Sequence, residues 1–326
     1  MLDVFLTVDT EFWPRRPYVA AGDYLDDFRR DVDGRTPEGD FGLGYQLDRL
    51  TAAGLRAVFF VEALCANAVG IEPVREMVQR VRQGGHDVQL HLHTEWLDRM
   101  PQPLLPGRAG RHVRHFSEDE QTLLIGNALE RLIEAGAGRP AAFRAGNYGA
   151  NLDTLRALAR NRIRFDTSYN PAYLDSACDM PREGLLLQPE PWLGVVEFPI
   201  TFVRTFTGRR RPLQLTACSS GEIEQALWQA WRRGWGSVVL VWHSFELIRG
   251  RNVPPFRARL DRIALGRFER LCRFLQRHRD KFRTTTFAEP LATECLGNSQ
   301  ALPLRARAAD TLVRWVEQLT RRMSRQ

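Results

Sequence analysis

The sequence predicts an α/β fold in which a single domain forms a distorted (β/α)7-type barrel, followed by a helical C-terminal tail. Three observations favour this fold. Short apolar runs of strand length alternate with amphipathic runs of helix length along most of the chain. The apolar runs are nearly continuous, which is typical of parallel strands buried on both faces. The length of 326 residues is one that a single α/β barrel commonly fills.

The predicted strands share short runs of mostly apolar residues bounded by turn or helix signals. Because each run but the last is followed by a helical pattern or a long polar segment, the strands are expected to lie parallel to one another. The predicted strands are residues 2–8, 56–61, 87–92, 141–144, 163–165, 195–199, 238–242 and 283–286.

The predicted helices have apolar residues at helical spacing and boundaries of recognised types. Gly54 and the pair Gly84-Gly85 end two of them. Ser117 and Glu120 have the spacing of a capping box at the start of another. The predicted helices are residues 45–53, 72–82, 117–135, 152–160, 222–233 and 257–279.

Three long segments interrupt this alternation, at residues 12–39, 97–116 and 171–194. Each follows the C-terminal end of a predicted strand, which is the catalytic face of a barrel. Long segments of this kind in compact domains are usually lids or binding loops. We therefore expect them to shape a binding site.

The composition limits the classes of partner. Lys and Arg total 46 against 39 Asp and Glu, for a net charge of +7, and Lys281 is the only lysine. Because the arginines are scattered, they predict general attraction to anionic surfaces and no specific nucleic-acid binding. The five cysteines are far apart and fit a reducing compartment. With neither a signal-peptide pattern nor a membrane-spanning run, we expect a cytoplasmic protein, with peripheral contact on the inner face of the membrane as an addition.

We place the barrel at residues 1–290 and a basic amphipathic tail at 291–326. The tail combines an apolar stripe (Leu312, Val313, Val316, Leu319) with several arginines. Two interpretations stay open: a final helix packed on the barrel, or a segment that lies on an anionic membrane or a partner. The arginines are Arg305, Arg307, Arg314, Arg321, Arg322 and Arg325.

Four places at predicted strand ends carry polar residues that would be able to take part in catalysis or metal binding. In the first, Asp9 and Glu11 lie two residues apart after a strand and point the same way if the chain stays extended. One carboxylate on a metal ion and one acting as a base would be a natural pair. A turn with a helix cap is the alternative.

In the second place, His91 and His93 share one face of a predicted strand, and Glu95 follows. Neutral imidazoles with a nearby carboxylate suit Zn²⁺ or a similar first-row ion. Three of the seven histidines lie within eight residues here, which favours metal binding over structural histidines. His86 precedes the strand and is expected to be structural.

In the third place, Arg144 ends a strand and Gly146, Asn147, Tyr148 and Gly149 follow. Backbone N–H groups of such a tight loop can stabilise an oxyanion, and an arginine can orient a carboxylate. A glycine-rich turn without function is the alternative.

In the fourth place, His243 follows a strongly apolar strand and would project into the mouth of the barrel. There it would be able to donate a proton to a leaving group. A strand-end histidine without a catalytic role is the alternative.

The order and type of these four motifs resemble the polysaccharide deacetylase family, the NodB-homology or carbohydrate esterase family 4 proteins, over roughly residues 2–290. The resemblance implies that Asp9 is the general base, that Arg144 orients it and that His243 is the acid. It also implies roles for Tyr148 and the neighbouring Asn147 in holding the oxyanion. Asp166, in an Asp-x-Ser segment, matches a further family motif.

The metal ligands depart from the family pattern. Glu11 fits an Asp-x-Glu version of the first motif, and His91 matches the first metal histidine. Four residues later the family has a histidine where this chain has Glu95. Alignment favours Glu95 as the third ligand and strand geometry favours His93, so we retain both with a slight preference for Glu95.

The activity implied by the resemblance is metal-dependent hydrolysis of an N-acetyl group on an amino sugar or glycoconjugate, a non-peptide C–N bond. The expected cofactor is a divalent ion, Zn²⁺ first, with Co, Ni or Mn as alternatives. Trp13 and Trp96 would be able to stack on sugar rings, with core packing as the alternative. A cytoplasmic location implies a small or lipid-linked glycan precursor. Hydrolysis of a cyclic amide or imide, or a non-catalytic glycan-binding barrel, remain the competing functions.

Overall fold

The structure is a computed structural model that describes residues 1–14, 22–174, 176–251, 258–289 and 301–323. Its main sheet has the strand order β12-β1-β4-β5-β6-β7-β9-β8, and β15 pairs with the first part of β1. All neighbours in it are parallel except β8 and β9, which are antiparallel. The strands are β1 (Leu2–Thr10), β4 (Val58–Glu62), β5 (Asp87–Leu92), β6 (Ala142–Ala145), β7 (Phe165–Asp166), β8 (Glu190–Trp192), β9 (Val195–Glu197), β12 (Ser237–His243) and β15 (Phe282–Thr284).

The sheet curls into the distorted barrel that the sequence predicts, and an irregular segment covers its last edge. The backbone N–H of Thr201 donates to the carbonyl of Val239 at 3.2 Å. Further along β12, Val241 bonds with Leu213 and Leu215, with N···O distances of 3.1 and 3.2 Å. The outer edge of β12 is therefore paired without a regular strand beside it.

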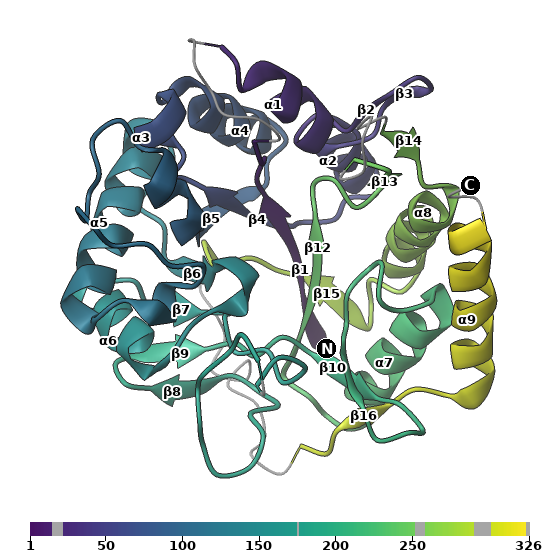
Figure 1. Cartoon of the computed structure of the whole chain (residues 1–326). Helices are drawn as coiled ribbons and strands as arrows, with labels where there is room; N and C mark the ends of the chain where they lie inside the picture. The colour runs from purple at the N-terminus through teal and green to yellow at the C-terminus, as the bar shows by residue number, and fades with distance from the viewer. Residues whose placement is uncertain (15–21, 175, 252–257, 290–300, 324–326) are drawn as a thin grey trace.

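Helices surround the sheet on its outer face (Figure 1). Ser117 caps α5 with the predicted capping box, in which its side chain and that of Glu120 bond each other's backbone N–H groups. Asn151 and Ser219 cap α6 and α7 in the same way. The helices are α1 (Leu25–Asp31), α2 (Leu43–Ala52), α3 (Ala66–Val69), α4 (Glu72–Gln83), α5 (Glu118–Glu134), α6 (Leu152–Arg160), α7 (Ser220–Arg232), α8 (Arg262–Arg277) and α9 (Ala308–Met323), with 3-10 turns η1 (Thr94–Arg99), η2 (Val113–His115) and η3 (Gly146–Tyr148).

The core has two layers, and the division between them determines where the polar strand ends point. Phe5, Phe60 and Val241 belong to a cluster inside the barrel, whereas Leu6, Phe59 and Leu240 pack outward against the helices. Since side chains alternate along a strand, the inward series of β1 continues from Phe5 to Asp9. The barrel interior is therefore apolar below and becomes polar at the C-terminal ends of the strands.

Some predicted boundaries change. Residues 12–39, expected as a loop, contain α1 and the hairpin of β2 (Arg35–Thr36) and β3 (Gly39–Asp40). The helix predicted over 257–279 begins only at Arg262, because Asp261 caps it and the preceding residues pair as β14 (Arg259–Leu260) with β13 (Ile248–Arg249). Residue 257 lies outside the described residues.

The C-terminal tail is attached to the barrel through a small second sheet. In it β10 (Phe202–Arg204) lies between β11 (Arg210–Pro212) and β16 (Leu304–Arg305). The predicted domain boundary at residue 290, Cys295 and Arg325 lie outside the described residues. Within the described ranges, no helix has the length and apolar character needed to cross a membrane.

Candidate active site

Strand pairing brings the four predicted motifs together at the C-terminal rim of the barrel. Asp9 on β1 is level with His243 on β12. On the other side of β1, His91 of β5 is level with Glu62 of β4 and with Arg144 of β6. Residues level with each other in a parallel sheet point to the same face, so side chains from five strands converge inside the rim.

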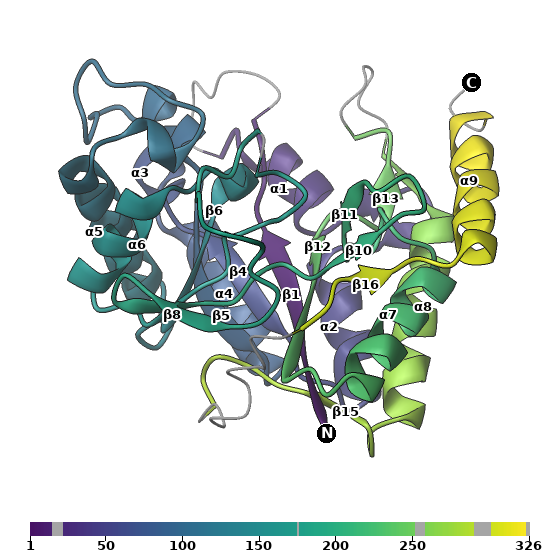
Figure 2. The same ribbon diagram turned by 90° about the horizontal axis from the view of Figure 1, so that it is seen from below.

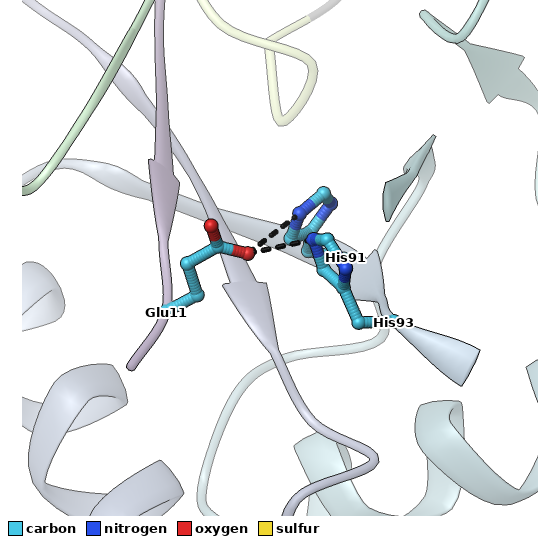
Figure 3. Close-up of side chains that lie close together, drawn as sticks. All are labelled: Glu11, His91 and His93. Carbon is cyan, nitrogen blue, oxygen red and sulfur yellow. Dashed lines mark ion pairs between the residues drawn. The ribbon is translucent and has the colours of Figure 1, made fainter. Parts of the chain in front are cut away.

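Glu11, His91 and His93 form the closest cluster of metal-binding groups in the described part of the chain (Figure 3). Oε2 of Glu11 lies 2.7 Å from Nε2 of His93 and 3.4 Å from Nε2 of His91. All three ligand atoms lie within 4.8 Å of one another, and all three residues are buried. The ligand atoms of tetrahedral zinc stand roughly 3.3 Å apart, so the spacing suits one small divalent ion.

The hydrogen bonds on the far side of each imidazole indicate that the cluster needs a cation. Nδ1 of His91 lies 2.8 Å from the carbonyl oxygen of Arg144, which can only accept, so Nδ1 carries the proton. Nδ1 of His93 lies 3.1 Å from Oε2 of Glu95 and donates for the same reason. In neutral rings both Nε2 lone pairs would then face a carboxylate oxygen that has no hydrogen-bond donor. A proton or a metal ion among the three groups resolves this conflict.

The charges in the cluster shift its pKa values accordingly. Burial alone would raise the pKa of Glu11, but the charges and hydrogen bonds of His93 and His91 hold it well below its usual range. Burial alone would lower the pKa of His93, yet Glu11 and Glu95 raise it well above the usual value. Without metal, the cluster therefore retains a proton that a divalent ion would displace.

Glu95 lies one layer further out than these three groups. Its Oε2 accepts from Nδ1 of His93, and its Oε1 accepts from Nδ2 of Asn147 at 2.9 Å. His93 thus occupies the position between Glu11 and Glu95, so the geometry favours His93 over Glu95 as the third ligand, contrary to our preference from alignment. Glu62 also helps to hold His93, because Oε1 of Glu62 accepts from the backbone N–H of His93 at 3.5 Å.

The Asp9 carboxylate is held by a buried arginine. Nη1 of Arg144 donates to Oδ1 of Asp9 at 2.5 Å, and Nη2 donates to Oγ1 of Thr7 at 2.8 Å. Arg144 is fully buried, and its guanidinium also lies 4.4 Å from the ring centroid of Phe60. This leaves Oδ2 of Asp9 facing the cleft, 3.8 Å from Nε2 of His243.

His243 is oriented by Glu246, a residue that the sequence analysis did not single out. Nδ1 of His243 lies 2.8 Å from Oε1 of Glu246, whose other oxygen accepts from Oγ1 of Thr216 at 2.8 Å. Burial alone would lower the pKa of His243, but Glu246, Asp9 and Glu11 together raise it above its usual value. The spacing His-x-x-Glu was visible in the sequence as a potential pair.

A cleft of about 480 Å³ opens over these groups, with Asp9, Glu11, His91, His93 and His243 in its floor. Two of the three long segments line it, as expected, whereas no described residue of the third, 12–39, does. Segment 97–116 contributes Arg111 and His112, and segment 171–194 contributes Tyr173, Ser176 and Ala177. The remaining lining residues are Ala145, Asn147, Tyr148 and Gln214.

The glycine-rich loop after Arg144 is shaped by two histidines. A Cβ atom on Gly146 would lie 2.6 Å from the ring of His93, and one on Gly149 would lie 2.4 Å from Cβ of His112. Between them, Asn147 and Tyr148 have φ values of 54° and 57°, a left-handed conformation that is costly for residues with side chains. The loop therefore packs directly against the side chains of His93 and His112.

Comparison with solved structures identifies the architecture. A candidate polysaccharide deacetylase from Mycobacterium smegmatis matches 94% of this chain and 93% of its own length, with a TM-score of 0.53 and 18% identity. The chain has the polysaccharide deacetylase fold. No protein-family model and no curated protein sequence matches it.

Two further solved structures match less well. A family 4 carbohydrate esterase from Streptomyces lividans, in complex with acetate, is 14% identical with a TM-score of 0.41, over 87% of this chain and 91% of that one. A family 4 acetyl xylan esterase from Clostridium thermocellum, in complex with a cobalt ion, is 12% identical with a TM-score of 0.39, over 88% of each chain.

Five predicted site residues are not part of the cleft lining. Arg144 and Glu95 bond the lining residues Asp9 and His93, and the other three are Trp13, Trp96 and Asp166. Trp96 is fully buried and stacks on Trp13, with ring centroids 5.7 Å apart. Trp13 in turn packs edge-on against His93, at 4.7 Å between centroids. Both indoles therefore support the His93 side of the site from behind. Inside the cleft, Tyr148 and Tyr173 stack with their ring centroids 5.6 Å apart.

Asp166 is the third. It is level with Phe143 and Glu197 on neighbouring strands and is fully buried, away from the cleft lining. Burial raises the pKa of Asp166, and burial and the charge of Asp166 raise the pKa of Glu197 well above the usual value. Asp166 accepts from Ser168, whose Oγ accepts from the backbone N–H of Ala145, so the pair supports the strand that carries Arg144.

Proposed function

We propose that this protein is a metal-dependent hydrolase that removes N-acetyl groups from an amino sugar. The observation that carries the proposal is the position of Asp9 with Arg144, of His243 with Glu246, and of the Glu11–His91–His93 cluster around one cleft. These are the parts that amide hydrolysis requires: a base, an acid and a site for a Lewis acid. The shared fold adds support at the level of architecture.

A divalent ion held by Glu11, His91 and His93 would supply Lewis-acid polarisation and a strong nucleophile at neutral pH. Donors of one carboxylate and two imidazoles suit zinc first, and cobalt, nickel or manganese as alternatives. The partners of both Nδ1 atoms keep the rings in the form that presents Nε2 lone pairs.

In the proposed reaction, Oδ2 of Asp9 takes a proton from the attacking water while Arg144 holds Oδ1 in place. The backbone N–H of Tyr148 and the side chain of Asn147 stabilise the negative charge on the acetyl oxygen. Nε2 of His243 then protonates the departing nitrogen, and Glu246 fixes the ring that does so. The C–N bond breaks, and the products are acetate and a free amine.

The acid role of His243 gives a prediction for the dependence of activity on pH. Activity should fall as pH rises through the pKa of His243, because the deprotonated ring has no proton to donate. Since Glu246 raises that pKa, Glu246→Gln is expected to move the alkaline limb of the kcat profile to lower pH. Glu269→Gln, on a carboxylate that bonds Tyr45 far from the cleft, is the control. An unchanged alkaline limb in the Glu246 variant would remove His243 from the acid role.

Metal titration can distinguish the two candidates for the third metal ligand, Glu95 and His93. Glu95→Ala should keep the metal and bind it about 10- to 100-fold more weakly, because it removes only the partner of His93. His93→Ala should abolish stoichiometric binding. Competition with a chelator measures both affinities. The opposite pattern, with metal lost from the Glu95 variant and kept in the His93 variant, would restore Glu95 as the ligand.

We further propose a small or lipid-linked glycan precursor in the cytoplasm as the substrate. A cleft of about 480 Å³ has the size of a small-molecule site. Acetate release should be measured on N-acetylglucosamine oligomers of increasing length, a lipid-linked N-acetylated sugar and a cyclic imide. Faster release from long polymer would contradict the substrate proposal, turnover of the imide alone would contradict deacetylation, and metal-free protein that still binds glycan would indicate a binding barrel.

A further inference from the structure

Helix α9 packs on the barrel with its polar face. Thr311 and Arg314 are buried, whereas Leu312, Val313, Trp315, Val316 and Leu319 are 45–59% exposed. An amphipathic surface helix normally does the reverse and buries its apolar stripe. Figure 1 shows α9 along the outside of α7 and α8, and Figure 2 shows it at the edge of the molecule from another side.

Specific polar contacts hold α9 in this orientation. Oγ1 of Thr311 donates to Oε1 of Glu222 at 2.8 Å, and Nη2 of Arg267 donates to Oε2 of Glu317 at 2.5 Å. Arg321 forms an ion pair with Asp261, with a closest N···O distance of 2.5 Å. Glu222, Arg267 and Asp261 are all buried in the body of the protein. Rotation of α9 to bury the stripe would break these contacts and leave charges buried, which is strongly unfavourable.

The exposed stripe extends onto the neighbouring hairpin. Phe206, at the tip between β10 and β11, is 65% exposed and packs edge-on against Trp315, with ring centroids 5.9 Å apart. We call Phe206, Leu312, Val313, Trp315, Val316 and Leu319 the α9 patch. Contiguous exposed apolar patches of this kind mark surfaces that bind something.

The charges around the α9 patch indicate what binds there. Arg204, Arg209, Arg305 and Arg307 are exposed on the hairpin, on β16 and just before α9, and none forms an ion pair with a residue in the described ranges. The hairpin, residues 202–212, contains no acidic residue. The two acidic residues of α9, Asp310 and Glu317, are both partly buried against the body. The rim of the patch is therefore positive.

We propose that the α9 patch is a docking surface for an anionic lipid bilayer. The α9 patch combines apolar side chains, two aromatic rings in contact (Phe206 and Trp315) and arginines beside them. These are the features by which interfacial helices enter the headgroup region. A second copy of this chain is disfavoured, because a symmetric contact through the patch would bring the arginines of both copies together. The proposal does not depend on the proposed catalytic activity.

Vesicle flotation of the full chain tests the proposal with matched variants. Phosphatidylcholine vesicles, with and without phosphatidylglycerol, are the probe. Wild-type protein should float with the anionic vesicles, and less so as salt is raised. Val316→Ser/Leu319→Ser should weaken binding by about 10- to 100-fold, while Leu123→Ser/Ile133→Ser, the same change on exposed residues of α5, should not. Arg305→Gln/Arg307→Gln should weaken binding to anionic vesicles by about 30-fold and reduce the preference for them over neutral vesicles.

Thermal unfolding of each variant verifies that these outward-facing substitutions leave the fold intact. Failure of the wild type to bind either vesicle, or binding by the Val316/Leu319 variant equal to that of the control, would overturn the proposal. So would a dimer in sedimentation that the Val316/Leu319 variant abolishes, because it would assign the patch to self-association. Because flotation needs no turnover, its failure would leave the hydrolase proposal standing.

Discussion

His91→Ala is expected to abolish stoichiometric metal binding and to reduce acetate release by more than about 10³-fold, even with metal added in excess. The substitution leaves Glu11 buried with a single imidazole and removes the ring whose orientation the carbonyl of Arg144 fixes. Loss of the Lewis acid removes several kcal/mol of transition-state stabilisation, and each 1.36 kcal/mol corresponds to about tenfold in rate. Metal analysis of the dialysed protein and an acetate assay measure both effects.

His86→Ala is the matched control, since it removes a histidine just before the same strand. His86 bonds Thr51 and the backbone N–H of Ala57 and lies outside the cleft lining. It should retain metal and activity, with some loss of stability. A His91 variant that holds one equivalent of metal at wild-type affinity would disprove the ligand assignment.

Since metal displaces the proton held on His93, the metal affinity of the wild-type protein should also rise with pH.

Asp9→Asn is expected to lower kcat by about 10²- to 10⁴-fold while metal content stays at the wild-type level. The amide has the shape of the carboxylate and its oxygen can still accept from Arg144, so the rim should keep its structure. What it lacks is the basicity to take a proton from water. Because Asp9 lies outside the Glu11–His91–His93 cluster, its loss should separate chemistry from metal binding.

Asp3→Asn provides the comparison at the other end of β1. It makes the same chemical change in a buried residue that pairs with Arg283, remote from the cleft. Turnover in that variant should equal the wild-type value. If Asp9→Asn also lost its metal, the aspartate would belong to the ligand set, and if it kept full turnover, another group would be the base.

Local sequence signals were sufficient for most of the fold. The strand at 87–92 and the helix at 152–160 were predicted to the residue, because an alternation of polar and apolar residues and a well-spaced apolar stripe each define one element. The site followed from the same logic, since parallel strands end at a common rim and Asp9, His91, Arg144 and His243 all lie at or near strand ends. Period-two alternation along β1 and β5 placed their inward residues.

What could not be predicted depends on contacts between distant segments. Nothing near Trp96 in the sequence shows that it is covered by Trp13 and Phe12, and nothing near Asp166 shows the carboxyl of Glu197 beside it. The choice between His93 and Glu95 depended on where the chain turns after β5, which is into η1 at Thr94. For α9 the stripe was evident, but its outward direction follows from polar partners on α7 and α8.

The contact between Gly146 and His93 limits how such a site can diverge. Even one methyl group at position 146 would occupy the space of the imidazole ring, so the ring would have to leave or the loop would have to rise. Changes at these two positions are therefore coupled. A protein that first loses His93 can accept a larger residue at position 146, whereas one that first changes Gly146 displaces His93 and with it a proposed metal ligand. Inactive descendants of this scaffold should therefore carry both changes more often than either alone.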